Sequence, residues 1–157
     1  MNEFAQNQDI LAGPPVGLAF TSQEKAGSVI PAHSSLSTVK QDLVLIVDDD
    51  QGVREALKFA LQLEGLAVAT CDSGTELLCH PDLHRARCLV LDYVMPGMNG
   101  FAVLNELKRR NITLPVILIT APLSREVEQR ALAAGVAGVL EKPLLEDVLI
   151  NKIRNVM

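Results

Sequence analysis

Aromatic residues are scarce in this sequence: tryptophan is absent, and aromatics make up only 3% of the 157 residues. This scarcity argues against base-stacking surfaces and aromatic cages, which both need exposed rings. An excess of basic residues is also absent, because 14 Lys and Arg face 19 Asp and Glu, for a net charge of −5. Nucleic-acid binders usually carry a basic surface, so we expect that this chain binds no nucleic acid directly.

Cysteines are too few and too irregularly spaced for a disulfide framework or a zinc knuckle. The chain has only Cys71, Cys79 and Cys88, and we expect reduced thiols, as is usual in the cytosol. No apolar run approaches the ~20 residues that a membrane helix needs. The first residues lack the basic segment of a secretory signal, and Gly-Pro-Pro at 13–15 interrupts the first apolar stretch. These absences predict a cytoplasmic protein with no membrane contact.

A change in composition near residue 40 divides the chain. Residues 1–40 are rich in Gly and Pro, include the polar run 33–38, and show no sustained helical or strand periodicity. Such composition is typical of a flexible segment. We therefore expect a flexible N-terminal extension over residues 1–40 and one folded domain over residues 41–157, a length that suits a single domain.

From residue 42 onward, apolar runs that suit strands alternate with segments of helical spacing. The run at 43–47 is apolar throughout and rich in β-branched residues, as in a strand buried on both faces of a parallel sheet. Further strands are predicted at 66–71, 88–91, 116–119 and 136–141, and helices near 53–64, 73–80, 101–110, 124–134 and 145–156. This alternation predicts an α/β fold, a doubly wound five-stranded parallel sheet with five flanking helices.

Residues able to take part in chemistry follow four of the predicted strands. Three aspartates at 48–50 follow the first strand, Asp92 ends the third, Thr120 the fourth, and Lys142 the fifth. The carboxyl ends of parallel strands share one edge of the sheet, so we expect these groups to converge. Clustered carboxylates repel each other, and Mg²⁺, which prefers hard oxygen ligands, relieves that repulsion. With a lysine and a hydroxyl nearby, these groups suit phosphoryl transfer to an aspartate.

Each of these residues has an ordinary role when it is taken alone. Asp50 suits the N-cap of the following helix and is left out of the site. Thr120 by itself is a common strand residue, and Lys142 a common solvated charge. His80 and His84 show no pattern of metal ligands. The recurrence of reactive groups at four strand ends is what favours a site.

Four short motifs give the folded segment a specific resemblance. They are Val-Asp-Asp-Asp at 47–50, Leu-Asp-Tyr-Val-Met-Pro-Gly-Met-Asn-Gly at 91–100, Ile-Thr-Ala at 119–121 and Glu-Lys-Pro at 141–143. In this order and spacing they resemble the receiver domain of two-component response regulators, over about residues 42–157. The resemblance implies a flavodoxin-like sheet with strand order 2-1-3-4-5, and a phosphoryl-accepting signalling domain rather than an enzyme.

The resemblance also implies roles for individual acidic residues. Asp92 resembles the aspartate that is phosphorylated. Asp49 and Asp92 look like the two direct carboxylate ligands of Mg²⁺, the cofactor that the family uses. Asp48 is similar to the acid that holds the metal through water, and the backbone carbonyl of Val94 matches the third protein ligand.

Further roles follow for the hydroxyl, the lysine and the turn residues. Thr120 resembles the hydroxyl that moves toward the phosphoryl group, and Lys142 the lysine that pairs with it. Pro143 stands where the family has a proline, often in cis. Gly100 matches a glycine of the turn after the phosphorylated residue, where we expect a backbone path closed to other residues.

Two positions depart from the family pattern. Val139 stands where an aromatic residue usually follows the movement of the hydroxyl, and valine is too small to do so in the same way. Pro122 stands two residues after Thr120, where many members have a polar or aromatic residue. The first departure puts the usual route of the signal in doubt, and the second concerns the lifetime of the phosphorylated state.

The resemblance implies partners as well. A sensor histidine kinase or a phosphotransfer protein would donate the phosphoryl group, and a downstream target protein or an output domain, such as one that regulates transcription, would receive the signal. The chain ends with the last predicted helix, so it is either a stand-alone receiver or part of a longer regulator. A homodimer is left open.

Two other functions stay open at this stage. One is a degenerate receiver that binds proteins independently of phosphorylation, which the change at Val139 motivates. The other is a small Mg²⁺-dependent phosphohydrolase. That reaction needs a dedicated acid or base near the nucleophile, and Val94 stands two residues after Asp92, where a dehalogenase-like site would have a second acid.

Overall fold

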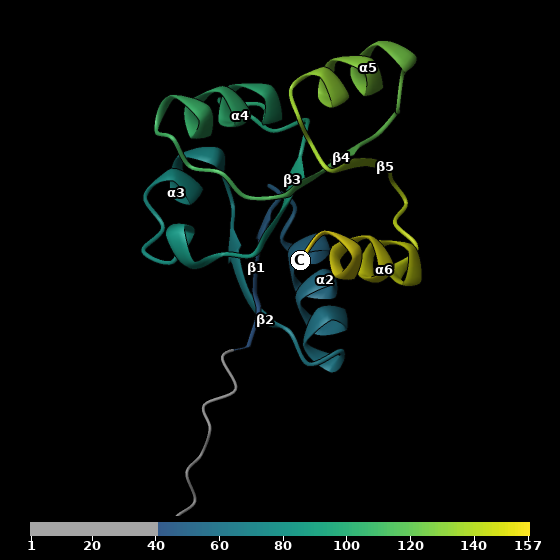
Figure 1. The fold of residues 1–157 in the computed structure, drawn as a ribbon. Helices are drawn as coiled ribbons and strands as arrows, with labels where there is room; N and C mark the ends of the chain where they lie inside the picture. The colour runs from purple at the N-terminus through teal and green to yellow at the C-terminus, as the bar shows by residue number, and fades with distance from the viewer. Residues whose placement is uncertain (1–40) are drawn as a thin grey trace, which may run out of the picture. The chain divides into compact units, whose positions relative to one another are not determined.

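Five strands and five α-helices alternate along residues 41–157, the part of the chain that the computed structural model describes (Figure 1). The predicted extension at 1–40 lies outside the described residues. The strands are β1 (Leu43–Val47), β2 (Ala67–Cys71), β3 (Cys88–Asp92), β4 (Val116–Thr120) and β5 (Gly138–Glu141). The helices are α2 (Gln51–Leu63), α3 (Gly74–Leu78), α4 (Gly100–Arg109), α5 (Arg125–Ala133) and α6 (Glu146–Val156), with an unpredicted 3₁₀ turn at Leu83–Arg85.

All strand pairs are parallel, and the strand order is β2-β1-β3-β4-β5. The predicted α/β fold and its 2-1-3-4-5 order are therefore confirmed. Buried side chains of α3, α4 and α5 pack in one core cluster, and those of α2 and α6 pack in another. Figure 1 shows the same division, with α2 and α6 together on one side of the sheet and α3, α4 and α5 on the other. The order reverses between β1 and β3, where such folds place their sites.

The inner strands are buried on both faces, as their apolar runs predict. Every residue of β3 and β4 is buried, and β1 is buried after its first residue. Alternate side chains of each strand enter the two core clusters. The polar residues at the ends of these strands, Asp92 and Thr120, are consequently buried as well, with exposed fractions of 3% and 1%.

Four helices begin at a polar side chain that accepts a hydrogen bond from a backbone N–H three residues later. These N-cap residues are Asp50, Ser73, Asn99 and Ser124. The prediction for Asp50 is confirmed. Asn99 was not predicted as a cap, because Gly100 was expected to lie outside the helix, whereas it is the first residue of α4.

Two predicted strands were too long at their amino ends, for the same physical reason. Leu66 donates its N–H to the carbonyl of Leu61, and Val136 donates to Ala131. In each case a glycine with positive φ precedes the donor, so the residue caps the helix before it and is unavailable to the strand. β2 therefore starts at Ala67, and β5 starts at Gly138, after Ala137, whose N–H donates to the Val116 carbonyl of β4.

None of the helices in the described region has both the length and the apolar character needed to cross a membrane.

Candidate functional site

The candidate site residues lie at or directly after the carboxyl ends of four strands, at one edge of the sheet. Val47 of β1 pairs with Leu91 of β3. The residues that follow them, Asp48 and Asp92, are therefore neighbours. On the other side of β3, Asp92 pairs with Ile119, which places Thr120 one residue beyond. The predicted convergence of these groups is a consequence of the parallel pairing and of the switch between β1 and β3.

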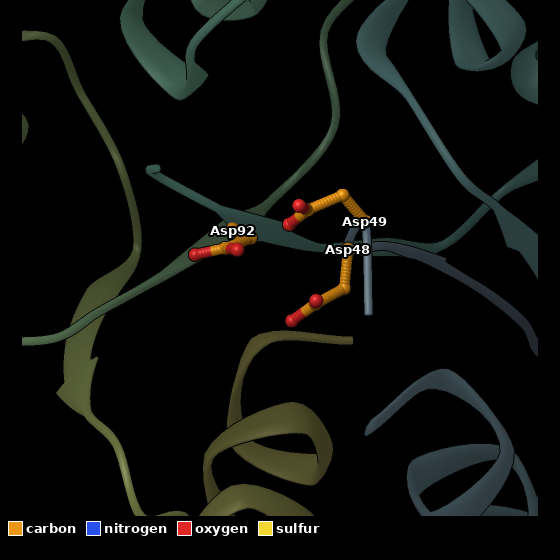
Figure 2. A group of neighbouring side chains, drawn as sticks. All are labelled: Asp48, Asp49 and Asp92. Carbon is orange, nitrogen blue, oxygen red and sulfur yellow. The ribbon is translucent and has the colours of Figure 1, made fainter. Parts of the chain in front are cut away.

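Three carboxylates form a compact cluster at this edge (Figure 2). One oxygen from each of Asp48, Asp49 and Asp92 lies within 4.8 Å of the others. Asp48 and Asp92 are buried, whereas Asp49 is exposed and so leaves the cluster open to solvent. Hard oxygen donors at this spacing fit Mg²⁺, which commonly uses one or two carboxylates and keeps several waters. Among residues 41–157 no other group of acidic, histidine or cysteine side chains has such an arrangement.

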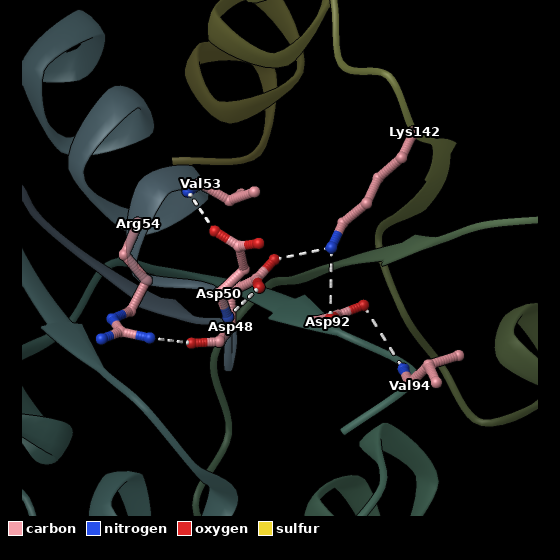
Figure 3. Close-up of polar contacts among 7 residues, drawn as sticks. All are labelled: Asp48, Asp50, Val53, Arg54, Asp92, Val94 and Lys142. Atoms are coloured by element: carbon pink, nitrogen blue, oxygen red, sulfur yellow. Dashed lines mark hydrogen bonds and ion pairs between the residues drawn. The ribbon is translucent and has the colours of Figure 1, made fainter. Parts of the chain in front are cut away.

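Lys142 links the two buried acids (Figure 3). Its Nζ lies 2.7 Å from Asp48 Oδ2 and 3.2 Å from Asp92 Oδ2. Burial lowers the pKa of the Lys142 ammonium, but its hydrogen bonds and the charges of both acids outweigh burial, so the pKa is raised. Burial and the charge of Asp48 raise the pKa of Asp92, against the opposing effect of Lys142. The lysine is therefore held as a cation between the two carboxylates.

Asp48 is held on three sides. Its Oδ1 accepts the N–H of Asp50 at 2.9 Å, its Oδ2 accepts from Lys142, and its backbone carbonyl accepts from Nη1 of Arg54 at 2.7 Å. Asp50 in turn caps α2 through Val53. Sequence reasoning missed Arg54, although an arginine in the first turn after an acidic run is a signal that could have been noticed.

The Thr120 hydroxyl is buried without a partner. Among the described residues, its Oγ1 is the one buried side-chain polar atom that makes no hydrogen bond. The backbone of Thr120 does have a partner: the N–H of Lys142 donates to the Thr120 carbonyl at 2.9 Å. Buried hydroxyls without a partner are uncommon and destabilising, so this one marks a position where a hydrogen-bonding ligand fits.

The turn after Asp92 approaches it closely. Val94 donates its N–H to Asp92 Oδ1 at 3.3 Å, and its side chain is 58% exposed. Gly100 follows a backbone path that a side chain would obstruct, as expected, although its φ is not positive and the positive φ in this turn belongs to Gly97. A Cβ on Gly100 would lie 3.0 Å from Tyr93 Cα and 3.1 Å from the Asp92 carbonyl. Glycine is therefore needed for close backbone packing beneath the site.

The expectations for the residues near Lys142 are confirmed in part. The Lys142–Pro143 peptide is cis as expected, and the Ala121–Pro122 peptide is also cis. Val139 is half-buried and packs against the core cluster on the side of α4 and α5. No role was predicted for the Glu141 side chain. Its Oε1 accepts the N–H of Leu123 at 2.8 Å and so connects β5 to the loop after Thr120.

The three cysteines and the two histidines of the described segment, His80 and His84, lie outside the acid cluster. All three cysteines are free, and burial raises the pKa of Cys71 and of Cys88 to about 12. His80 accepts the N–H of Asp82 through Nδ1. Neither histidine belongs to a metal-ligand group.

Comparison with curated proteins finds relatives that share this domain. Over 117 residues the chain is 36% identical to the C4-dicarboxylate transport transcriptional regulatory protein DctD of Pseudomonas aeruginosa, with coverage of 74% of this chain and 25% of DctD. Over 111 residues it is 35% identical to the response regulator MprA of Mycobacterium leprae, with coverage of 71% of this chain and 49% of MprA. The chain thus spans about a quarter of one relative and half of the other.

A solved structure agrees with the fold. The chemotaxis protein CheY4 of Vibrio cholerae superposes with a TM-score of 0.69 at 28% identity, and the match covers 74% of this chain and 99% of CheY4. The family model described as the response regulator receiver domain matches residues 44–154, which include every strand end described above. This chain therefore belongs to the response regulator receiver domain family, whose members are signalling domains of two-component systems.

Proposed function

We propose that residues 41–157 form a receiver domain that accepts a phosphoryl group on Asp92 from a histidine kinase or a phosphotransfer protein. The observation that carries this proposal is the environment of Asp92. Its buried carboxylate lies 3.2 Å from Lys142 Nζ and clusters with those of Asp48 and Asp49. The neighbouring strand β4 ends at Thr120, whose buried hydroxyl has no partner among the described residues. A carboxylate nucleophile, a cation beside it and a hydroxyl that is free to donate a hydrogen bond suit the transfer of a phosphoryl group to an aspartate.

In the proposed transfer, a carboxylate oxygen of Asp92 forms a bond to phosphorus while the bond from phosphorus to the donor's histidine nitrogen breaks. The bonding electrons stay with that nitrogen, which takes a proton from solvent. Lys142 screens the negative charge from its position beside Asp92. The Thr120 hydroxyl gains the acceptor that it lacks by donating to a phosphoryl oxygen.

The acid cluster holds the cofactor in this proposal. Asp49 and Asp92, with the backbone carbonyl of Val94, are the proposed direct ligands of Mg²⁺, and Asp48 is the proposed ligand through water. Bound Mg²⁺ neutralises the clustered carboxylates and screens the phosphoryl oxygens. The spacing of the three carboxylates supports this assignment.

Phosphorylation of Asp92 shifts an equilibrium between two states and so controls binding to a target protein or an output domain. A transcriptional output is one such role, because DctD is named as a transcriptional regulatory protein. Free thiols at Cys71, Cys79 and Cys88 support a location in the cytoplasm.

The test is transfer of labelled phosphate from a histidine kinase or a small acyl phosphate, with Mg²⁺ present. We expect the full chain to be labelled, the Asp92→Asn variant to remain unlabelled, and Asp50→Asn to be labelled like the wild type. Asp50 is the matched control because asparagine keeps its capping role outside the acid cluster. Equal labelling of the wild type and Asp92→Asn would end the assignment.

A second function, binding of proteins independently of phosphorylation, is favoured by the valine at 139, which is half-buried and small. The two functions differ in the affinity for a partner with and without beryllofluoride, a mimic of the phosphoryl group. An unchanged affinity supports a scaffold, and a changed affinity supports phosphorylation control.

A further inference from the structure

Arg54 contacts the main chain of the site, and the proposed chemistry does not use it. The residue lies in the first turn of α2 and is half-buried. Its Nη1 donates to the backbone carbonyl of Asp48 at 2.7 Å (Figure 3). This carbonyl lies just past the end of β1, where the last bond to β2 is the N–H of Asp48 to Cys71. Arg54 thus supplies the hydrogen bond that the strand ladder no longer provides.

The carbonyl that Arg54 holds belongs to the peptide that joins Asp48 to Asp49. Because a peptide unit is planar, fixing its oxygen also fixes the direction in which the chain continues into Asp49. The Asp48 carboxylate has other restraints, from Lys142 and from the N–H of Asp50. The Asp49 carboxylate is exposed and has no hydrogen bond to any residue of the described segment. Its direction therefore depends on the backbone that Arg54 holds.

We propose that Arg54 is a positioning residue: it orients the Asp48–Asp49 peptide so that the Asp49 carboxylate points at the metal position. The inference rests on the proposed Mg²⁺ site and extends it to a residue that touches neither the metal nor the phosphoryl group. Groups that orient metal ligands from behind typically change metal affinity by about 10–100-fold when they are removed.

The charge of Arg54 has the opposite effect on a bound cation. A guanidinium near a divalent ion repels it, so loss of the charge alone strengthens Mg²⁺ binding. Loss of the hydrogen bond weakens Mg²⁺ binding, because Asp49 loses its fixed direction. The sign of the change in affinity therefore separates positioning from a purely electrostatic role.

The experiment measures Mg²⁺ affinity of the full chain by calorimetry, and in parallel by the fluorescence of Tyr93. This residue is the only tyrosine in a chain without tryptophan, and it directly follows Asp92. No phosphoryl donor is present. Arg54→Met removes the charge and the donor, Arg54→Gln removes the charge and keeps an amide donor, and Arg54→Lys keeps both a charge and a donor. Lys58→Met is the matched control, because Lys58 is exposed one turn later on the same helix.

We expect Arg54→Met to weaken Mg²⁺ binding by about tenfold or more, with partial recovery in Arg54→Gln and Arg54→Lys. Lys58→Met should bind as the wild type does. Mg²⁺ binding by Arg54→Met that equals or exceeds the wild type overturns the proposal. Should Arg54→Met fail to fold without metal, as judged by thermal unfolding in chelator, the comparison of Arg54→Gln with Arg54→Lys decides. Tighter Mg²⁺ binding by Arg54→Gln than by Arg54→Lys and the wild type, the result of losing the charge alone, overturns the proposal, and weaker Mg²⁺ binding by Arg54→Gln than by the wild type supports it.

Failure of this inference and failure of the proposed function give different results. Mg²⁺ affinity is measured without a phosphoryl donor. Weaker Mg²⁺ binding by Arg54→Met therefore supports the positioning role even when the wild type accepts no labelled phosphate. Conversely, normal labelling of the wild type with unchanged affinity in Arg54→Met removes the role of Arg54 alone.

Discussion

The two halves of the site differ in how completely their buried polar groups are partnered. In the half formed by β1 and β3, Asp48 accepts hydrogen bonds from Lys142 and from the N–H of Asp50, and Asp92 forms an ion pair with Lys142 and accepts the N–H of Val94. In the half formed by β4 and β5, the Thr120 hydroxyl is buried with no partner among the described residues. The acidic half is therefore organised before any ligand arrives, whereas the hydroxyl half has a hydrogen bond still to make. A ligand that satisfies Thr120 would act on the second half more than on the first.

The largest effect is expected in the acidic half. Asp49→Asn removes one proposed ligand and one negative charge, so Mg²⁺ affinity should fall by about 100-fold or more, beyond the loss of an outer-shell partner. Calorimetric titration measures it, with Asp50→Asn as the control that keeps a helix cap. Unchanged affinity in Asp49→Asn would show that the acidic half is not built for the metal.

The next effect concerns the hydroxyl half. Thr120→Val replaces a buried hydroxyl that has no partner with a methyl group of similar shape, so the free energy of unfolding should rise by about 1 kcal/mol. The variant should also lose part of its labelling by an acyl phosphate, while its Mg²⁺ affinity stays as in the wild type. Denaturant unfolding checks the first result. The exposed Thr113→Val is the control, and equal changes in both variants would contradict the difference between the halves.

A third change restores the aromatic residue that β5 lacks. Val139→Phe should reduce the free energy of unfolding by about 1–3 kcal/mol, because a larger side chain must fit at a half-buried position that already packs against the core. In return, beryllofluoride should alter amide hydrogen exchange in α5 more in this variant than in the wild type. Leu140→Phe, on the opposite face of β5, should leave the exchange of α5 unaffected.

A smaller effect is expected where β5 is bonded to the loop that follows β4. Glu141→Gln weakens the bond that the Leu123 N–H makes to the Glu141 carboxylate, because charged acceptors bind more strongly than neutral ones. The Leu123 amide should then exchange several-fold faster, an estimate that follows from a loss of about 1 kcal/mol. Hydrogen exchange followed by NMR measures it, and Glu146→Gln on α6 provides a control at a residue without such a bond.

The smallest effect lies outside both halves. Hydrogen bonds from Arg109 and Arg110 lower the pKa of Glu106 to about 2. Because the pKa is lower in the folded state than in the unfolded chain, the contribution of Glu106 to stability is present above about pH 4.3 and is lost as the pH falls toward 2. Glu106→Gln should therefore be less stable than the wild type at pH 7, and the two should become equally stable only below the folded-state pKa of about 2. Urea unfolding across this range tests the sign.

Predictions from the sequence were most accurate where a property repeats along the chain. Apolar runs were enough to place all five strands, and the cap at Asp50 follows from its residue type and position. They were least accurate at element ends, where two chain segments compete for one residue. Leu66 and Val136 look like strand residues by composition, yet the preceding helix uses their N–H groups.

Residue types and spacing were sufficient for the fold class, the edge of the sheet that carries the site, and the carboxylates on it, because strand periodicity and the direction of parallel strands are one-dimensional properties. Packing alone established that Lys142 joins Asp48 to Asp92, that the Thr120 hydroxyl has no partner, and that Arg54 holds the backbone beside Asp49. The reason is that hydrogen bonds depend on angles and on distances of tenths of an ångström. Most of these groups come from segments far apart in the chain, and their relative position is decided only when the sheet and its helices pack.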